Sequence, residues 1–230
     1  MTIYVVAPNA CKESAKKLAS FLKAKFVTKD FLSTNKEDVV FNYGMGYLTV
    51  RGMARIINPR DNVSICVDKF DTFKMLKSGG IPIPRFTTSR TMAAKLWKGH
   101  VVVRRTTTGS KNEGMEIIEM PAQLPVAPLY TQYYEHRKEI RVVVFQGEIA
   151  GVYEKEYLGD DSMWSFVPLE RKKCYTKMTE TCIKAANVLG MDYVGFDVLY
   201  NNTNNFVILE ANSGPILTDE VGNFIKSKLL

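Results

Sequence analysis

Two acidic residues stand in apolar, strand-like runs near the end of the sequence. The segment GFDVLYNNTNNFVILEANSGP, residues 195–215, places Asp197 in the first run and Glu210 in the second, with a polar turn between them. Side chains alternate between the two faces of a strand, so Glu210 and Asn212 share a face. If paired residue numbers in this hairpin sum to an odd value, Asp197 lies on that face too. An even sum points the two acids apart.

Two carboxylates on one face require a cation. Like charges about 5 Å apart repel by roughly 3 kcal/mol at an effective dielectric constant of about 20. A divalent ion reverses the sign of this energy, and two carboxylates with the amide oxygen of Asn212 suit Mg²⁺, which also binds water and substrate phosphates. The hairpin therefore predicts a Mg²⁺ site at Asp197, Glu210 and Asn212, with Mn²⁺ as an alternative ion. The competing interpretation is a solvent-facing acid on each strand.

A glycine-containing loop between two earlier strand-like runs could meet phosphate groups. The segment RRTTTGSKNEGM, residues 104–115, offers Gly109, Gly114, several hydroxyls and Lys111. Such loops can point backbone N–H groups at phosphate oxygens. The segment matches neither the Walker A pattern nor the Rossmann glycine pattern. Taken alone, it is explained better as an ordinary polar hairpin tip.

The first half of the chain alternates strand and helix patterns, which predicts an α/β (α+β) fold. IYVVAP, KFVT and DVVFNYG are strand-like, and apolar residues recur at helical spacing between residues 15 and 22, so residues 1–60 predict a small βαβ unit. INPRDN predicts a boundary loop. A helix is expected over about 68–78, ended by Gly79-Gly80.

The elements expected next are a strand near PRFTTS, a short helix around MAAKLWKG, and a β-hairpin formed by HVVVRR and GMEIIEM. EIRVVVF and EIAGVYEKEY predict two more strands, joined at Gln146-Gly147. Apolar residues from Met178 to Leu189 predict a helix capped by Gly190. Residues 157–174 have no clear period and predict a mobile or substrate-facing loop.

Composition restricts the class of protein. The chain has 230 residues and is 46% hydrophobic, enough to bury a sizeable core. Its four cysteines form no C-x-x-C pair and stand with only two histidines, which favours reduced thiols in a cytoplasmic protein over a zinc site or disulfides. No run approaches the roughly 18 apolar residues of a membrane span, and the first residues contain no basic leader, so we expect neither membrane contact nor targeting.

The chain is basic, with a formal charge of +7. Such a charge suits an anionic ligand, although a mildly basic solvated surface explains it equally well. Lysines and arginines form no block interleaved with aromatic residues, which argues against nucleic acid as a partner.

The order of these segments resembles the ATP-grasp family. Asp68-Lys69 on a helix is followed by GIPIP, VVVRR with its glycine loop, LYTQYYE, EIRVVV, GFDVLY and ILEANSGP. The resemblance covers residues 58–217, and its specific element is the pattern D-x(12)-E-x-N-x-x-P. It implies two α+β lobes that clasp ATP after a small βαβ domain. The implied domains are 1–62 (pre-ATP-grasp), 63–131 (N-terminal lobe with the phosphate loop) and 132–230 (C-terminal lobe with the metal site).

The resemblance also implies site residues, position by position. Lys69 and Arg104 match the positions that reach the nucleotide phosphates. The family usually has lysine where Arg104 stands, and arginine is a planar fork instead of a point donor. Gln132, Tyr133 and Tyr134 match the strand that meets adenine, and Glu139 matches the acid that takes the ribose hydroxyls. The implied nucleotide contacts are Lys69, Arg104, Thr107, Thr108, Gly109, Ser110, Lys111, Gln132, Tyr133, Tyr134 and Glu139.

Arg141 and Lys155 match basic positions that contact the transferred phosphate or the acyl phosphate, and are the implied catalytic residues. For these two, and for Glu139, an exposed strand residue is the competing interpretation. Asp197, Glu210 and Asn212 fall on the Mg²⁺ ligands of the family.

The implied activity is that of a minimal ATP- and Mg²⁺-dependent carboxylate–amine ligase, resembling the ribosomal-protein glutamate ligase and D-alanine–D-alanine ligase branches. Its partners would be a small-molecule acid and an amine, or a peptide or protein acceptor, and a homodimer is also considered. Residues 157–174 and the N-terminal unit would shape the acceptor site. The alternatives are a kinase on the same fold, a nucleotide-binding regulatory protein without turnover, as Arg104 suggests, and a protein outside the family.

Overall fold

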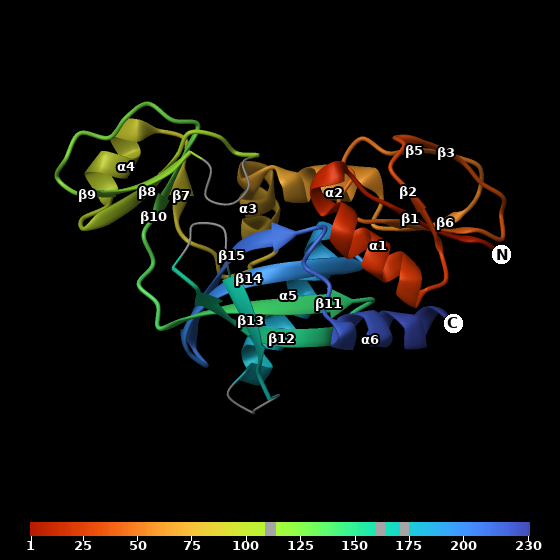
Figure 1. The fold of residues 1–230 in the computed structure, drawn as a ribbon. Coiled ribbons are helices and arrows are strands. Elements are labelled where there is room, and N and C mark those ends of the chain that lie inside the picture. Colours follow the sequence, from red (N-terminus) through yellow and green to blue (C-terminus); the bar gives the residue numbers. More distant parts are fainter. Residues whose placement is uncertain (109–113, 160–163, 171–174) are drawn as a thin grey trace.

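The chain folds around a central antiparallel sheet with a smaller sheet at each end (Figure 1). The computed structural model describes residues 1–108, 114–159, 164–170 and 175–230. Parallel and antiparallel strands occur together with helices, so the predicted mixed α/β class is confirmed. No helix in this part of the chain is long and apolar enough to cross a membrane.

The N-terminal unit is built on a parallel sheet in the order β2-β1-β4-β6. Helix α1 (Lys12–Phe21) follows a short turn, η1 (Asn9–Cys11), and connects β1 to β2 in parallel, which confirms the predicted βαβ unit. A second parallel pair, β3 and β5, was not anticipated because each strand has only three residues. The strands are β1 (Ile3–Val6), β2 (Lys25–Val27), β3 (Phe31–Ser33), β4 (Val39–Asn42), β5 (Thr49–Arg51) and β6 (Arg55–Ile57).

Two helices follow where one was expected. The predicted boundary loop INPRDN is wrong in its second half, because α2 (Arg60–Val67) begins there with Pro59 as its N-cap. Proline and aspartate favour turns but also suit the first turn of a helix, so their presence does not decide between the two. The predicted helix over 68–78 is confirmed as α3 (Lys69–Ser78), with Asp68 as its N-cap.

A four-stranded antiparallel sheet in the order β7-β10-β8-β9 lies at the end of the molecule opposite the N-terminal unit (Figure 1). Its core includes the side chains of Ala93 and Trp97, from α4 (Arg90–Leu96) and its C-cap, packed on Val101 and Val103. The predicted strand near PRFTTS, the short helix and the hairpin of HVVVRR with GMEIIEM are confirmed. The strands are β7 (Phe86–Thr87), β8 (His100–Arg104), β9 (Met115–Glu119) and β10 (Leu129–Gln132).

The central sheet has the order β13-β12-β11-β14-β15 and is antiparallel throughout. The prediction of a loop over 157–174 is wrong for Trp164–Pro168, which form β13 at the sheet edge; residues 160–163 and 171–174 lie outside the described part. Five residues are too few for their alternation to stand out from an irregular segment. The strands are β11 (Lys138–Phe145), β12 (Glu148–Tyr157), β13 (Trp164–Pro168), β14 (Tyr193–Asn202) and β15 (Asn205–Asn212).

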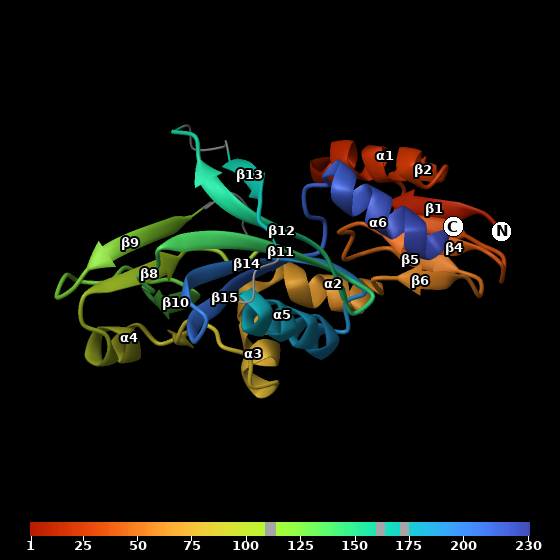
Figure 2. The same cartoon turned by 90° about the horizontal axis from the view of Figure 1, so that it is seen from below.

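The two faces of the central sheet have different neighbours (Figure 2). One face is apolar and packs on α5 (Thr176–Leu189), which ends at the predicted cap Gly190, together with α2 and α3. The other face carries Phe145 and Tyr193 at one end, where they pack against the N-terminal unit and the unanticipated α6 (Asp219–Leu229). Further along, this second face carries charged side chains, among them Arg141 and Asp197, together with aromatic ones.

Free thiols are present at Cys11, Cys66 and Cys182, and the last two are buried. Cys174 lies outside the described residues.

Asn58 joins the N-terminal unit to the central sheet. It is fully buried at the end of β6, where its side-chain amide donates to the backbone O of Tyr193 at 2.7 Å and its Oδ1 accepts from Tyr193 N at 2.8 Å. Its φ of +60° lies in the left-handed region, which asparagine tolerates better than most residues. Asn58 therefore satisfies two buried backbone groups at the start of β14.

We expect Asn58→Ala to lower the free energy of unfolding by about 2–4 kcal/mol, because it leaves the N–H and C=O of Tyr193 buried without partners. Denaturant unfolding measures this change. Asn9→Ala is the matched control, since Asn9 is exposed, and it should change stability by less than about 0.5 kcal/mol. Equal effects of the two substitutions would contradict the assignment.

Candidate active site

A row of charged side chains crosses three strands of the central sheet. Arg141 on β11 stands directly opposite Asp197 on β14, and Asp197 stands directly opposite Glu210 on β15. Directly opposite residues share a face of a sheet, so all three side chains point to the same side. Asn212 lies two residues beyond Glu210 and therefore on this face as well, opposite Gly195.

The pairing of β14 with β15 meets the condition under which Asp197 and Glu210 share a face. Paired residue numbers give an odd sum at Asp197–Glu210 but an even sum from Val198–Ile208 to Tyr200–Phe206. The parity changes at a bulge where Leu209 has no partner of its own. A bulge re-aims the side chains around it. Without it, the even register of the outer hairpin would point Asp197 and Glu210 to opposite faces.

Asp197 is buried and paired with two cations. Nε of Arg141 donates to its Oδ1, and Nη2 of Arg141 and Nζ of Lys155 donate to its Oδ2 at 3.0 and 2.9 Å. Burial by itself would raise the pKa of Asp197, but Arg141 and Lys155 outweigh it and hold the pKa below its usual range. Asp197 is therefore ionised at neutral pH. Lys155 also pairs with Glu139, its cross-strand neighbour.

Gly195 permits the close packing around Arg141. A Cβ at this position would lie 2.8 Å from Cβ of Pro215 and 3.1 Å from Cδ of Arg141. The first of these distances is too short for two carbon atoms. A side chain at Gly195 would therefore displace Pro215, the last residue of the acidic hairpin segment.

The start of α3 brings Lys69 to the same cleft. Nζ of Lys69 lies 3.7 Å from Oε1 of Glu210. The cap residue Asp68 also accepts a hydrogen bond from Oγ1 of Thr107 at 2.6 Å, and Lys69 N donates to the backbone O of Thr107 at 2.9 Å. These bonds fix the beginning of the glycine loop on the helix end. N of Thr108 donates to Oγ1 of Thr106 at 3.2 Å.

Of the two arginines that end β8, only Arg104 faces the cleft. It is 7% exposed, and its Nε has no partner among the described residues. Burial lowers the pKa of the Arg104 guanidinium, and the nearby Glu210 partly offsets this effect. Arg105 is exposed and pairs with Glu116 at 2.7 Å across the hairpin. A buried guanidinium N–H without a partner is costly, so Arg104 fits a site that receives an anion.

These residues line one cleft of about 660 Å³. It lies between the central sheet and the β7–β10 sheet, and its apolar lining includes Val102, Ile117 and the bulge residue Leu209. The structure brings together eleven of the residues singled out from the sequence. They are Lys69, Arg104, Gln132, Tyr133, Tyr134, Glu139, Arg141, Lys155, Asp197, Glu210 and Asn212.

The remaining members of that set are placed differently. Thr107 and Thr108 are not among the cleft-lining residues, whereas their neighbour Thr106 is. Gly109, Ser110 and Lys111 lie outside the described residues. Cleft-lining residues that the sequence did not single out include Leu209 and Ile216. Trp164 and Phe166 also line the cleft, and they belong to the segment 157–174, which was expected to face the substrate as a loop and not as a strand.

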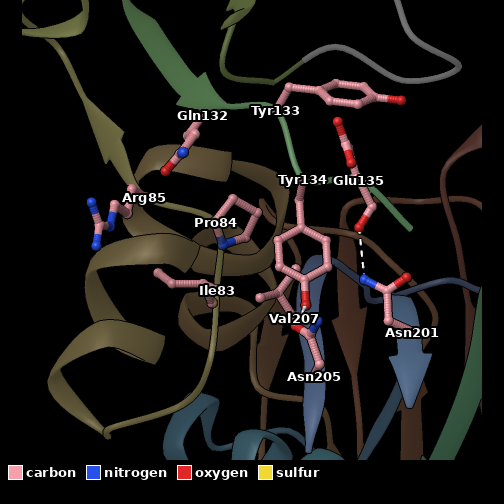
Figure 3. A pocket seen from close by; sticks show the side chains of 10 residues that line it. All are labelled: Ile83, Pro84, Arg85, Gln132, Tyr133, Tyr134, Glu135, Asn201, Asn205 and Val207. Carbon is pink, nitrogen blue, oxygen red and sulfur yellow. Dashed lines mark hydrogen bonds between the residues drawn. The ribbon is translucent and has the colours of Figure 1, made fainter. Parts of the chain in front are cut away.

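A second pocket of about 550 Å³ shares Pro84, Gln132, Tyr133 and Tyr134 with the cleft (Figure 3). In Figure 3 the Tyr134 ring points toward the β14–β15 hairpin, where its hydroxyl bonds to Oδ1 of Asn205. The backbone O of the next residue, Glu135, accepts a hydrogen bond from Nδ2 of Asn201 at 2.7 Å. The segment after β10 is therefore tied to the central sheet.

The donor set around Glu210 suits a hard cation. Among the described residues no group of three or more His, Cys, Asp or Glu side chains could hold a metal, so the two acids depend on a further ligand. The Asn212 amide can supply it, and its buried Nδ2 has no partner in the described part of the chain. Two carboxylates and an amide oxygen are ligands that Mg²⁺ accepts. The residues present fit this ion.

No known family profile matches the chain. Curated proteins do: N-acetylaspartylglutamate synthase A from Homo sapiens is 28% identical over 183 residues, which are 69% of this chain and 46% of the relative. Glutamate–LysW ligase ArgX from Sulfolobus acidocaldarius is 27% identical over 183 residues, 69% of this chain and 64% of the relative. The chain thus spans less than two thirds of the length of either protein.

Solved structures match nearly the whole chain. The RimK domain ATP-grasp protein from Sphaerobacter thermophilus has a TM-score of 0.70 at 14% identity, and the match covers all of both chains. The ATP-grasp ligase PsnB, complexed with minimal precursor, Mg and ADP, has a TM-score of 0.69 at 13% identity and covers 99% of this chain and 96% of its own. These matches show that the chain has the ATP-grasp fold, with its cleft between the two antiparallel sheets.

Proposed function

We propose that the protein is an ATP- and Mg²⁺-dependent ligase that activates a carboxylate as an acyl phosphate and joins it to an amine. The observation that carries the proposal is the meeting of four cations with a pair of acids in one cleft. The names of the two curated relatives, a glutamate ligase and a synthase of N-acetylaspartylglutamate, support this class of reaction. The members of the charged set are Lys69, Arg104, Arg141, Lys155, Asp197 and Glu210.

The proposed reaction consists of two displacements. A carboxylate oxygen of the acid attacks the γ-phosphorus of ATP, the bond to the β,γ-bridging oxygen breaks, and ADP leaves. The amine nitrogen then attacks the acyl carbon, the C–O bond to phosphate breaks, and inorganic phosphate leaves as the amine loses a proton to solvent. The products are an amide, ADP and phosphate. Such a reaction depends mainly on alignment and charge compensation.

The residues of the cleft divide into a nucleotide end and a transfer end. At the nucleotide end, Lys69 and Arg104 would bind phosphate oxygens. Gln132 would meet the adenine ring beside Val102 and Leu209, and Glu139 would accept hydrogen bonds from the ribose hydroxyls. The bulge at Leu209 supports this assignment, because it brings an apolar side chain and the adjacent Glu210 into the same cleft.

At the transfer end, Arg141 and Lys155 would stabilise the transferred phosphoryl group. Asp197, Glu210 and Asn212 would hold Mg²⁺, which supplies charge neutralisation to phosphate oxygens. Arg141 and Lys155 both hold Asp197 in the structure. Each must therefore exchange at least part of that contact for a phosphate or carboxylate oxygen during the reaction.

The partners proposed are a small-molecule acid and an amine, with a peptide or protein acceptor included because PsnB is a ligase that binds a precursor. The free thiols at Cys11, Cys66 and Cys182 support a cytoplasmic location.

The ligase is tested by supplying Mg-ATP with panels of acids and amines and measuring ADP together with the mass of any product. We expect ADP release that depends on the acid and a product that equals acid plus amine minus water. Hydroxylamine should trap the activated acid as a hydroxamate. Phosphate on an alcohol would instead identify a kinase. Thermal stabilisation by Mg-ATP without ADP formation across the panels would identify a binding protein.

The two neighbouring arginines give a matched test of the nucleotide end. We expect Arg104→Ala to weaken Mg-ATP binding about 10- to 100-fold, since a hydrogen bond to a charged group contributes about 1.5–3 kcal/mol. Arg105→Ala removes the same charge from an exposed position and should change affinity less than about 3-fold. Isothermal titration calorimetry measures both. If the two variants bind alike, Arg104 does not contact the nucleotide.

Glu210→Gln tests the metal ligands. The substitution removes one of two carboxylates while keeping size and hydrogen bonding, so the Mg²⁺ concentration that half-saturates the stabilising effect of ATP should rise at least about 10-fold. Thermal unfolding over a Mg²⁺ titration at fixed ATP measures this shift. Glu119→Gln, at an exposed position on β9, is the control and should leave it unchanged. An unchanged Mg²⁺ dependence in Glu210→Gln would remove Glu210 from the ligand set.

A further inference from the structure

The transfer end of the cleft is bordered by aromatic side chains. On the edge strand β13, Phe166 stands opposite Lys155 and Trp164 stands opposite Tyr157, so these side chains share the face that carries the charged row. Nζ of Lys155 lies 4.5 Å from the centre of the Trp164 ring, and Cζ of Arg141 lies 5.3 Å from the centre of the Phe166 ring. Each cation of the transfer end therefore has an aromatic ring over it.

The aromatic border continues as apolar surface. Trp164 and Phe166 are half-buried and line the cleft, as does Ile216, whose side chain is 56% exposed. Ile216 therefore extends the apolar border that Trp164 and Phe166 form. Pro215, before Ile216, also lines the cleft, and its backbone O accepts the Tyr43 hydroxyl, which fixes this segment to the N-terminal unit.

The described lining of the cleft contains five basic side chains. They are Lys69, Arg104, His136, Arg141 and Lys155. Lys69 and Arg104 lie at the nucleotide end, and His136 follows the segment that meets adenine. Within the part of the chain that the structure describes, the transfer end thus has cations for one carboxylate and no separate cation for a second.

We infer that the acid substrate carries its reacting carboxylate next to a large apolar or aromatic group, and that Trp164 and Phe166 select it. This inference rests on the proposed ligase activity. The carboxylate would meet Arg141 and Lys155 while the apolar group lies against the two rings, which buries apolar surface on both sides. A second carboxylate would lie against the electron-rich ring faces, desolvated and without a cation, which is unfavourable.

Binding is tested first without turnover, using the fluorescence of Trp164. The chain has two tryptophans, and the other, Trp97, is buried in the core beneath α4. N-acetylphenylalanine and N-acetylleucine are titrated against N-acetylaspartate and N-acetylglutamate in the presence of Mg²⁺ and a non-hydrolysable ATP analogue. We expect the apolar acids to change the emission of the wild type and not that of Trp164→Phe. They should bind at least about 10-fold more tightly than the diacids.

Variants then separate selection from a purely structural role of the rings. Trp164→Ala should weaken binding of N-acetylphenylalanine about 10-fold by calorimetry and leave affinity for the ATP analogue unchanged, whereas Trp164→Phe should retain most of the affinity. Val167→Ala is the matched control, because Val167 lies on the same strand and points to the opposite face. It should bind like the wild type. Thermal unfolding of each variant confirms that it is folded.

Several outcomes overturn the inference. It fails if the diacids bind as tightly as the apolar acids. It also fails if Trp164→Ala lowers stability but not affinity, because the rings then only cover the ion pairs. A wrong proposal of ligase activity gives a different result: apolar acids still bind and change the emission of Trp164, but no acid of the panel releases ADP. That result supports the selective surface and rejects the activity built on it.

Discussion

The arrangement of the cleft depends on the buried carboxylate of Asp197, which lies in a sheet where an unpaired charge would be strongly unfavourable. Arg141 from one neighbouring strand neutralises it directly, and Lys155 reaches it from one strand further away. Loss of one partner from such a buried pair typically costs about 3–5 kcal/mol, so the strands cannot slip relative to one another without a large penalty. The contacts that fix the register of the sheet therefore also fix the positions of the charged side chains in the cleft.

The rest of the fold leaves these charged side chains facing the cleft. The opposite face of the central sheet is apolar and covered by α5, while the end that carries Phe145 and Tyr193 is closed by α6 and the N-terminal unit. The part of the second face next to the β7–β10 sheet lines the cleft, and that sheet contributes Arg104 to it. Lys69 enters from a third element, the start of α3, which Asp68 caps and Thr107 ties to the glycine loop. Charged side chains from three separate elements thus converge on one cleft.

The sequence predicted the acids of this site but not the means by which they share a face. Asp197 and Glu210 were recognisable because ionisable residues in apolar strands need an explanation. The bulge at Leu209 was not, because it arises from pairing between strands and leaves no local pattern. The resemblance to the ATP-grasp family singled out Arg104 over Arg105, and Arg104 lines the cleft. Helix α2 and strand β13 were missed because each is short, and turn-forming residues or an irregular segment adjoin them.

Trp164 and Phe166 lie on β13, the edge strand of the central sheet, where a substitution disturbs fewer neighbours. Strand β13 has one neighbour, β12, whereas the strands of Arg141 and Asp197 each have two. A substitution that breaks the pairing of an inner strand affects the neighbours on both of its sides. A substitution at Trp164 or Phe166 alters the border of the cleft without moving the charged row, since Lys155 remains held by Glu139 and Asp197. In the proposed ligase, different strands of one sheet therefore carry the residues for phosphoryl transfer and those for the choice of acid.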